Sequence, residues 1–200
     1  FQAITYSIED IALIGNKTEI DNFICHMDHV ATLLKNVGGQ FAVFGSPGLR
    51  KSIGPNKKEL AELFAKIDQL FSRQGVHFAL ETVPSYYGCN LFCSLSETDS
   101  FINEQNFMNV SRHFDSACQY LSNDLHGNEF HGFLKRSKHL HISEVDLNTF
   151  ASPSEFNLSL VPVIKQHYKG EWCVLEMGDK VHSRENFIKS IKNFTTLYLT

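Results

Sequence analysis

Residues 139–144 read His-Leu-His-Ile-Ser-Glu, a short run in which polar and apolar side chains alternate before a carboxylate. Such a run, bounded by polar segments, is typical of a β-strand. Three other short runs end in the same way: Leu80-Glu81, 113–115 (HFD) and 174–177 (VLEM). A helical pattern follows each of them, and this repetition decides the prediction of the fold.

On both sides of these runs, predicted strands alternate with predicted amphipathic helices. The predicted strands cover 1–7, 41–44, 76–82, 108–115, 139–145 and 171–176. The predicted helices cover 16–37, 56–75, 97–106 (capped by Ser96 or Thr98), 117–136 with a break at Gly127, 152–166 from Ser152-Pro153, and the segment after Ser183. The six β/α units indicate a parallel sheet with helices outside it, in a single domain over residues 1–200.

Two architectures fit this alternation, a doubly wound open sheet and a (β/α) barrel of the TIM type. The sequence contains neither G-x-G-x-x-G nor a Walker A motif, which removes the best support for a nucleotide-binding open sheet.

Composition excludes several classes of protein. The net charge is −4, and the basic residues are scattered rather than gathered in a stripe, which argues against nucleic acid as a partner. No long uncharged apolar stretch predicts a membrane span. The five cysteines are widely spaced except for Cys89 and Cys93, which favours reduced, mostly buried thiols and a cytoplasmic location.

Four strand ends carry a side chain that can bind a divalent cation: Glu81, Asp115, His141 and Glu176. The carboxyl ends of barrel strands converge on one face, so these groups are expected to meet there. Three carboxylates would repel one another without a cation, and their mixture with a histidine suits Mn²⁺, Mg²⁺, Co²⁺ or Zn²⁺. His139 shares the face of His141 by the two-residue period, so either one is open to a core role instead.

Further polar residues are candidates for binding a substrate. Ser46 and Arg50 lie in a Gly- and Pro-containing loop that suits phosphate or sugar hydroxyls, although an ordinary strand-to-helix loop has the same composition. Tyr87 and Asn90 follow Glu81 and would line a sugar pocket or belong to a packed surface loop.

Two more ionisable residues lie beside the predicted strand ends. Glu144 is expected to orient a ligand or bind substrate, and His113 is expected to face a helix.

Five segments in order resemble landmarks of the xylose isomerase-like superfamily of sugar phosphate isomerases and epimerases. They are FAVFGSPGLRKS (41–52), LETVPSYYGCNLF (80–92), RHFDSAC (112–118), HLHISEVDL (139–147) and YKGEWCVLEM (168–177). The resemblance extends over almost the whole chain and implies a TIM-type barrel. It also implies a metal set of Glu81, Asp115, His141 and Glu176, with His141 rather than His139 as the ligand ahead of Ile-Ser-Glu.

By the same resemblance, Glu81 and Glu176 form the acid/base pair. One glutamate would remove a proton from the carbon beside a carbonyl, and the other would return it, while one divalent metal ion stabilises the enediolate oxygen. The implied activity is that of a metal-dependent isomerase or epimerase of a small sugar or sugar phosphate.

The sequence also departs from the family's pattern. Members usually begin with two further β/α units before the segment that matches residues 1–7, so the resemblance implies an incomplete or N-terminally truncated barrel. Cys118 stands where many members have a substrate-binding histidine, and Asn90 stands at an acidic position. These changes bear on the identity of the sugar.

Two other functions compete with this one. The first is a non-catalytic partial barrel that binds a partner, needs a complementing chain or self-associates through open sheet edges. The second is a metal-dependent phosphodiesterase or endonuclease like the superfamily's apurinic endonucleases. It is disfavoured because Cys118 and the segment 146–148 lack the histidines of a three-zinc cluster.

Overall fold

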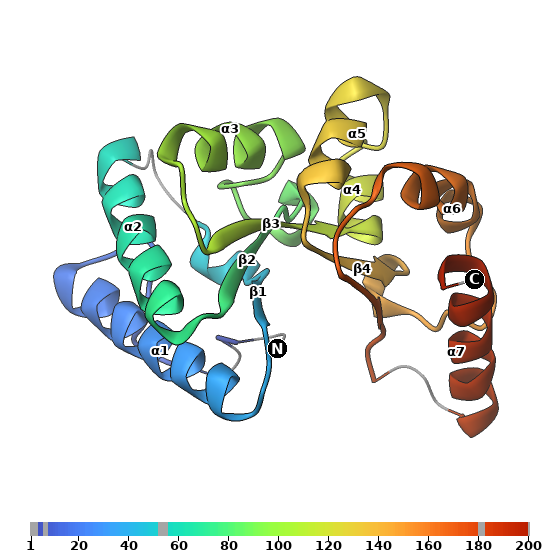
Figure 1. The fold of residues 1–200 in the computed structure, drawn as a ribbon, viewed down its shortest axis with the longest axis horizontal. Helices are drawn as coiled ribbons and strands as arrows, with labels where there is room; N and C mark the ends of the chain where they lie inside the picture. Colours follow the sequence, from blue (N-terminus) through green and yellow to red (C-terminus); the bar gives the residue numbers. More distant parts are fainter. Residues whose placement is uncertain (1–3, 6–7, 52–55, 180–182, 200) are drawn as a thin grey trace. The chain divides into compact units, whose positions relative to one another are not determined.

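The computed structural model describes residues 4–5, 8–51, 56–179 and 183–199 (Figure 1). The chain forms two compact units, an N-terminal unit (Phe1–Arg112) and a C-terminal unit (His113–Thr200). The prediction that residues 1–200 form one barrel domain stays a prediction. Among the described helices, none combines the length and the apolar character needed to cross a membrane.

Helices and strands alternate through both units. The N-terminal unit contains α1 (Lys17–Asn36), β1 (Phe41–Phe44), the 3-10 turn η1 (Pro47–Leu49), α2 (Lys57–Gln74), β2 (His77–Glu81), η2 (Ser85–Tyr87) and α3 (Leu95–Gln105). Strand β3 (Val110–Asp115) crosses the boundary between the units. The C-terminal unit continues with α4 (Ser116–Leu121), α5 (Gly127–Arg136), β4 (His139–Ser143), η3 (Val145–Leu147), α6 (Glu155–His167), β5 (Trp172–Glu176) and α7 (Arg184–Tyr198).

The strand order separates the two architectures that the sequence allowed. Parallel pairs join β1 to β2, β3 to β4 and β4 to β5, and the order in the sheet follows the chain, β1-β2-β3-β4-β5. A doubly wound sheet reverses its order at a switch point, whereas successive strands of a (β/α) barrel are neighbours throughout. The described strands therefore have the topology of part of a (β/α) barrel.

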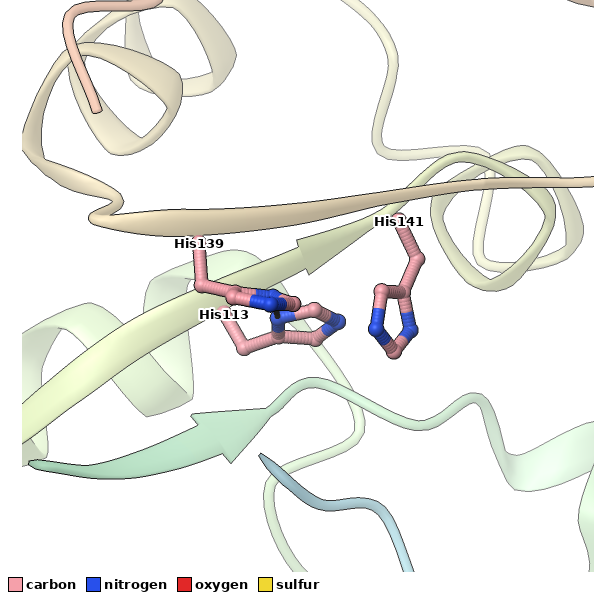
Figure 2. A group of neighbouring side chains, drawn as sticks. All are labelled: His113, His139 and His141. Carbon is pink, nitrogen blue, oxygen red and sulfur yellow. Dashed lines mark hydrogen bonds between the residues drawn. The ribbon is translucent and has the colours of Figure 1, made fainter. Parts of the chain in front are cut away.

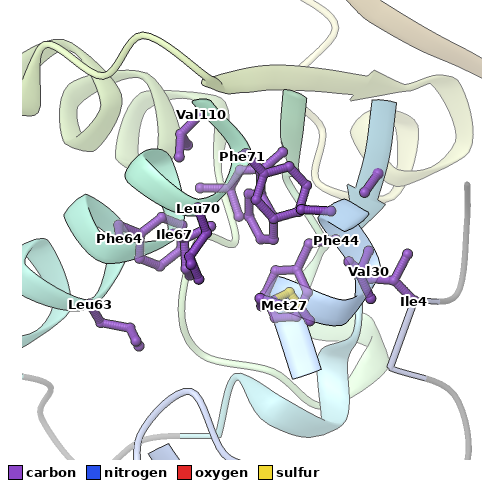
Figure 3. Close-up of a cluster of buried hydrophobic side chains, with 14 of the residues drawn as sticks. Ile4, Met27, Val30, Phe44, Leu63, Phe64, Ile67, Leu70, Phe71 and Val110 are labelled. Carbon is purple, nitrogen blue, oxygen red and sulfur yellow. The ribbon is translucent and has the colours of Figure 1, made fainter. Parts of the chain in front are cut away.

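An aromatic core holds the N-terminal unit together (Figure 3). Helices α1 and α2 pack against each other and onto β1 and β2. Phe64 on α2 is fully buried, and its ring lies 5.9 Å from that of Phe78 and 5.0 Å from that of Phe101. Local signals set the helix ends: Asn16 caps α1 through a bond from the Glu19 amide (3.0 Å), and Gly75 ends α2 with a φ of 68°.

Side chains of β1 and β2 alternate between the two faces of the sheet. Phe44 and Phe78 belong to the core beneath the helices. Val43 and Ala79 belong to a separate small cluster. Glu81 has the same parity as Ala79, so it lies on the face that the helices leave uncovered.

The C-terminal unit follows the same rule. Phe114 on β3 and Ile142 on β4 are fully buried, and the ring of Phe114 lies 5.7 Å from that of Phe130 on α5. The alternate residues of these strands, including Asp115 and His141, point to the opposite face. The two-residue period thus separates the apolar side chains from the ionisable ones.

Most predicted elements are confirmed, with shifts at their ends. Strand β1 has the predicted bounds, and the predicted helix 117–136 is divided into α4 and α5. The predicted cap of α3 was wrong, because Ser94 caps this helix, and α6 begins after Ser154 rather than at Ser152-Pro153. In α3 the Ser94 hydroxyl accepts from the Glu97 amide at 3.2 Å, one turn before the predicted start.

The predicted first strand, 1–7, falls mostly outside the described residues. Ile4 and Thr5 are described, and they form a turn.

Replacing Phe64 with alanine should lower the free energy of unfolding by about 3–5 kcal/mol, because it empties a fully buried aromatic site. Phe187→Ala is the matched control on α7, where the side chain is 49% exposed, and a change within about 0.5 kcal/mol is expected. Urea denaturation followed by circular dichroism measures both. Equal losses for the two variants would contradict this assignment of the core.

Candidate metal centre

Three predicted ligands meet in the C-terminal unit, at the carboxyl ends of three neighbouring strands. Asp115 ends β3, His141 lies in β4 and Glu176 ends β5. One ligand atom from each lies within 4.8 Å of the others, and His141 Nδ1 is 2.9 Å from a Glu176 carboxylate oxygen. This separation suits atoms that share one cation.

Strand register explains why these residues meet. Asp115 is opposite His141 across the β3–β4 pair, and Ser143 is opposite Glu176 across the β4–β5 pair. His141 and Ser143 are two residues apart and therefore face the same way. The ligands follow a diagonal over the sheet face opposite Phe114.

Hydrogen bonds hold the Asp115 carboxylate in place. One oxygen accepts from the Cys118 amide (2.7 Å) and caps α4, while the other accepts from the Ser143 hydroxyl (2.7 Å). Ser143 is fixed in turn, because its amide donates to the Ser116 hydroxyl at 2.9 Å and that hydroxyl donates to the Ser143 carbonyl at 3.0 Å. Such outer contacts orient a metal ligand.

The electrostatics of this cluster favour a bound cation. Burial is the main cause that raises the pKa of Asp115 above its ordinary value of 3.8, and the neighbouring charge of Glu176 raises it further. His141 and the hydrogen bonds from Cys118 and Ser143 act in the opposite direction. A divalent ion would remove the repulsion between the carboxylates, so the donor set fits Mn²⁺, Mg²⁺, Co²⁺ or Zn²⁺.

The fourth predicted ligand, Glu81, belongs to the N-terminal unit, and its place in the metal set stays a prediction. Within that unit the Arg50 guanidinium donates to the Glu81 carbonyl (2.6 Å) and to the Phe44 carbonyl. A Cβ atom at position 45 would collide with the Glu81 carboxylate, so Gly45 leaves the room that this side chain occupies.

Several predicted substrate contacts have structural partners inside the N-terminal unit. Arg50 is fully buried, with its guanidinium carbon 4.9 Å from the centre of the Phe44 ring. Ser46 shares a hydrogen bond with Thr5, and the Asn90 amide donates to the Arg50 carbonyl (3.1 Å). These contacts order the loops after β1 and β2, while their substrate role stays a prediction.

The remaining substrate candidates lie in both units. In the N-terminal unit the half-buried Tyr87 lies beside Tyr86, with 5.1 Å between the ring centres. In the C-terminal unit Glu144 is buried and accepts from the Ser154 amide (2.9 Å) and the Asn157 amide group (3.0 Å), which anchors the start of α6. Cys118 is buried in α4.

The prediction for His113 was wrong. It does not face a helix but lies against two other histidines on the ligand face (Figure 2). Its Nδ1 is 3.1 Å from His139 Nδ1, and its ring centre is 4.2 Å from that of His141. The signal was present in the sequence, since His113 is two residues before Asp115 and must share its face.

All five cysteines lie among the described residues as reduced thiols, but only Cys89 and Cys118 are buried. The prediction of mostly buried thiols therefore holds for two residues, while Cys25 is exposed. Cys89 Sγ lies 3.5 Å from Cys93 Sγ, and burial is the main cause that raises the pKa of Cys93 to about 12.

Solved structures of sugar epimerases share this fold. The chain aligns with a D-allulose 3-epimerase from Methylomonas sp. in complex with D-allulose (TM-score 0.72, 15% identity, 93% of this chain and 72% of that one). An L-ribulose 3-epimerase aligns with a TM-score of 0.73 at 14% identity, over 92% of this chain and 63% of that one. The IOLI protein, solved with a bound zinc atom, aligns with a TM-score of 0.66 at 14% identity, over 94% and 73%.

These likenesses establish the fold, and the chain spans roughly two thirds of the length of the proteins it matches. No family model matches the sequence, and no curated protein matches it.

Replacing Asp115 with asparagine should stabilise the metal-free protein at pH 7. The raised pKa means that the folded state binds the proton more tightly than the unfolded state. Stability from this group is therefore present below pH 3.8 and is lost as the pH rises through the raised value. The amide that replaces the carboxylate would stay neutral; its oxygen would accept from the Cys118 amide, and its NH2 group would donate to the Ser143 hydroxyl oxygen in place of the present bond.

Thermal melting in EDTA, measured from pH 7 down toward pH 3.8, tests the effect of Asp115→Asn on stability. The midpoint of Asp115→Asn should exceed that of wild type at pH 7, and the difference should shrink as the pH falls. Asp179→Asn, at an exposed position, is the control. A lower midpoint for Asp115→Asn at pH 7 would contradict the repulsion described here.

Proposed function

We propose that this protein is a divalent-metal-dependent isomerase or epimerase of a small sugar or sugar phosphate. The observation that carries the proposal is the meeting of Asp115, His141 and Glu176 at the carboxyl ends of three parallel strands. Active sites of (β/α) barrels are built at this end of the strands. The structural likeness to sugar epimerases supports the same class of reaction.

The three side chains would hold the cation through one imidazole nitrogen and carboxylate oxygens. A bound divalent ion polarises a substrate carbonyl and stabilises negative charge on its oxygen. Asp115 is suited to a purely binding role, since it is buried and both of its oxygens accept hydrogen bonds. Glu176 is more open, with 16% of its side chain exposed, so it can reach a substrate.

In the proposed mechanism, Glu176 and Glu81 act as the acid/base pair. One carboxylate removes the proton from the carbon beside the carbonyl, and the other returns a proton to the opposite face, which inverts that carbon. A carboxylate has two oxygens, so Glu176 can bind the ion through one and take the proton on the other. The role of Glu81 rests on the sequence resemblance and on its position at the end of β2.

The neighbours suggest ketoses as the substrate class. D-allulose and L-ribulose are ketoses, and the carbon that a 3-epimerase inverts is next to the ketone carbonyl. The five reduced thiols suit a reducing compartment, so the proposal includes a cytoplasmic location.

A second candidate is a partial barrel that binds a partner or a complementing chain. The favouring observation is the open side of the C-terminal unit: β5 residues are half-buried or exposed, and Trp172 is 46% exposed. Phe187 and Ile188 on α7 are also exposed. A strand edge and apolar side chains in this state can pair with further β/α units.

Metal binding is the first test. Wild type should bind one Mn²⁺ per chain in equilibrium dialysis, whereas Glu176→Gln and His141→Ala should each weaken binding by more than about 100-fold, since outer contacts alone are worth about 10–100-fold. Glu171→Gln, just before β5, should bind as wild type does. Wild type that takes up no Mn²⁺, Mg²⁺, Co²⁺ or Zn²⁺ at millimolar supply would refute the proposal.

Proton exchange is the second test. In D₂O, the Mn²⁺-loaded protein should incorporate deuterium at the carbon beside the carbonyl of D-allulose or L-ribulose, measured by NMR. Glu81→Gln should lose at least about 100-fold of the rate, the low end of general acid–base contributions, and should retain Mn²⁺ if its main role is proton transfer. Exchange that is unchanged in Glu81→Gln would remove this residue from the mechanism.

A further inference from the structure

The C-terminal unit contains a second group of possible metal ligands beside the first. His113, His139 and His141 each offer a ring nitrogen, and these nitrogens lie within 4.8 Å of one another (Figure 2). His141 also belongs to the carboxylate group with Asp115 and Glu176, so the two groups share one residue.

The three imidazoles come together because of strand register. His113 on β3 is directly opposite His139 on β4. This pair lies two residues before the pair formed by Asp115 and His141. Neighbouring side chains on one face of paired parallel strands are necessarily close. The result is a layer of imidazoles next to the layer of carboxylates.

The hydrogen bonds of this cluster are incomplete. His113 is fully buried, and its Nδ1 lies 3.1 Å from His139 Nδ1, where one nitrogen donates and the other accepts. The second ring nitrogen of His113, Nε2, is buried without a hydrogen-bond partner among the described residues. A buried polar atom in this state is costly, which points to a ligand that completes the cluster.

We propose that His113, His139 and His141 form a nitrogen-only site for a borderline transition-metal ion such as Zn²⁺ or Cu²⁺. This site differs from the carboxylate group in the ions it selects, because imidazole prefers Zn²⁺ and Cu²⁺, whereas carboxylates suit Mn²⁺ and Mg²⁺. Since both sites use His141, Zn²⁺ held by the histidines competes with Mn²⁺ held by the carboxylates. The inference stands whether or not the protein turns over a sugar.

The test measures the affinity of the metal-free chain for Zn²⁺ by chelator competition, and for Mn²⁺ by equilibrium dialysis. Asp115→Asn/Glu176→Gln should lose Mn²⁺ but keep its Zn²⁺ affinity within about tenfold, which is roughly 1.4 kcal/mol. His139→Gln should lose more than about 100-fold in Zn²⁺ affinity, above the cost of losing an outer contact. Zn²⁺ loss in the carboxylate double variant equal to its Mn²⁺ loss would overturn the site, as would unchanged Zn²⁺ binding in His139→Gln.

A surface histidine pair provides the matched control. His131 and His167 stack with 4.2 Å between ring centres on α5 and α6, so His131→Gln removes a histidine from a stacked pair outside the cluster. It should leave the Zn²⁺ affinity unchanged. If it abolishes Zn²⁺ binding, the ion is held at the surface and the proposal fails.

Electron paramagnetic resonance of Cu²⁺ provides a readout that does not depend on the folding of His139→Gln. In the carboxylate double variant with His131→Gln, the copper signal should show splitting from three nitrogens. Splitting from a single nitrogen would overturn the proposed site.

Discussion

The two-residue alternation of side chains along parallel strands is the constraint on which the rest of the structure depends. In the C-terminal unit it sends Phe114 and Ile142 toward the helices and Asp115 and His141 to the other face. The apolar half of each strand supplies the packing, and this leaves the other half free to carry ionisable groups. Burial on one face therefore offsets the cost of a polar cluster on the other face.

That cluster is unfavourable for a metal-free protein. Asp115 is buried near a second carboxylate, and its raised pKa records the conflict. The bonds from Ser143 and the Cys118 amide fix the orientation of the Asp115 carboxylate. Strain of this kind is expected where a site is arranged in advance for a charged ligand.

Much of this arrangement could be predicted from the sequence. The bounds of β1 followed from a short apolar run closed by glycine, and the meeting of Asp115, His141 and Glu176 followed from strands that end in ionisable residues, together with the topology of barrels. Strand register is not visible in one sequence, so the sharing of His141 by two groups had no sequence signal. The error at His113 came from neglecting the parity that places it beside Asp115, and the cap of α3 depended on a local choice between nearby serines.

Arg50 carries a consequence for how this protein can change over evolutionary time. Its buried guanidinium joins the carbonyls of Phe44 and Glu81, the last residues of β1 and β2. Lysine offers one compact charge and cannot reproduce the planar fork of the guanidinium, so even the substitution Arg50→Lys would disrupt these two bonds. The side chain of Tyr86 in the following loop is exposed. Substitutions at Tyr86 can therefore accumulate while Arg50 keeps the ends of β1 and β2 joined.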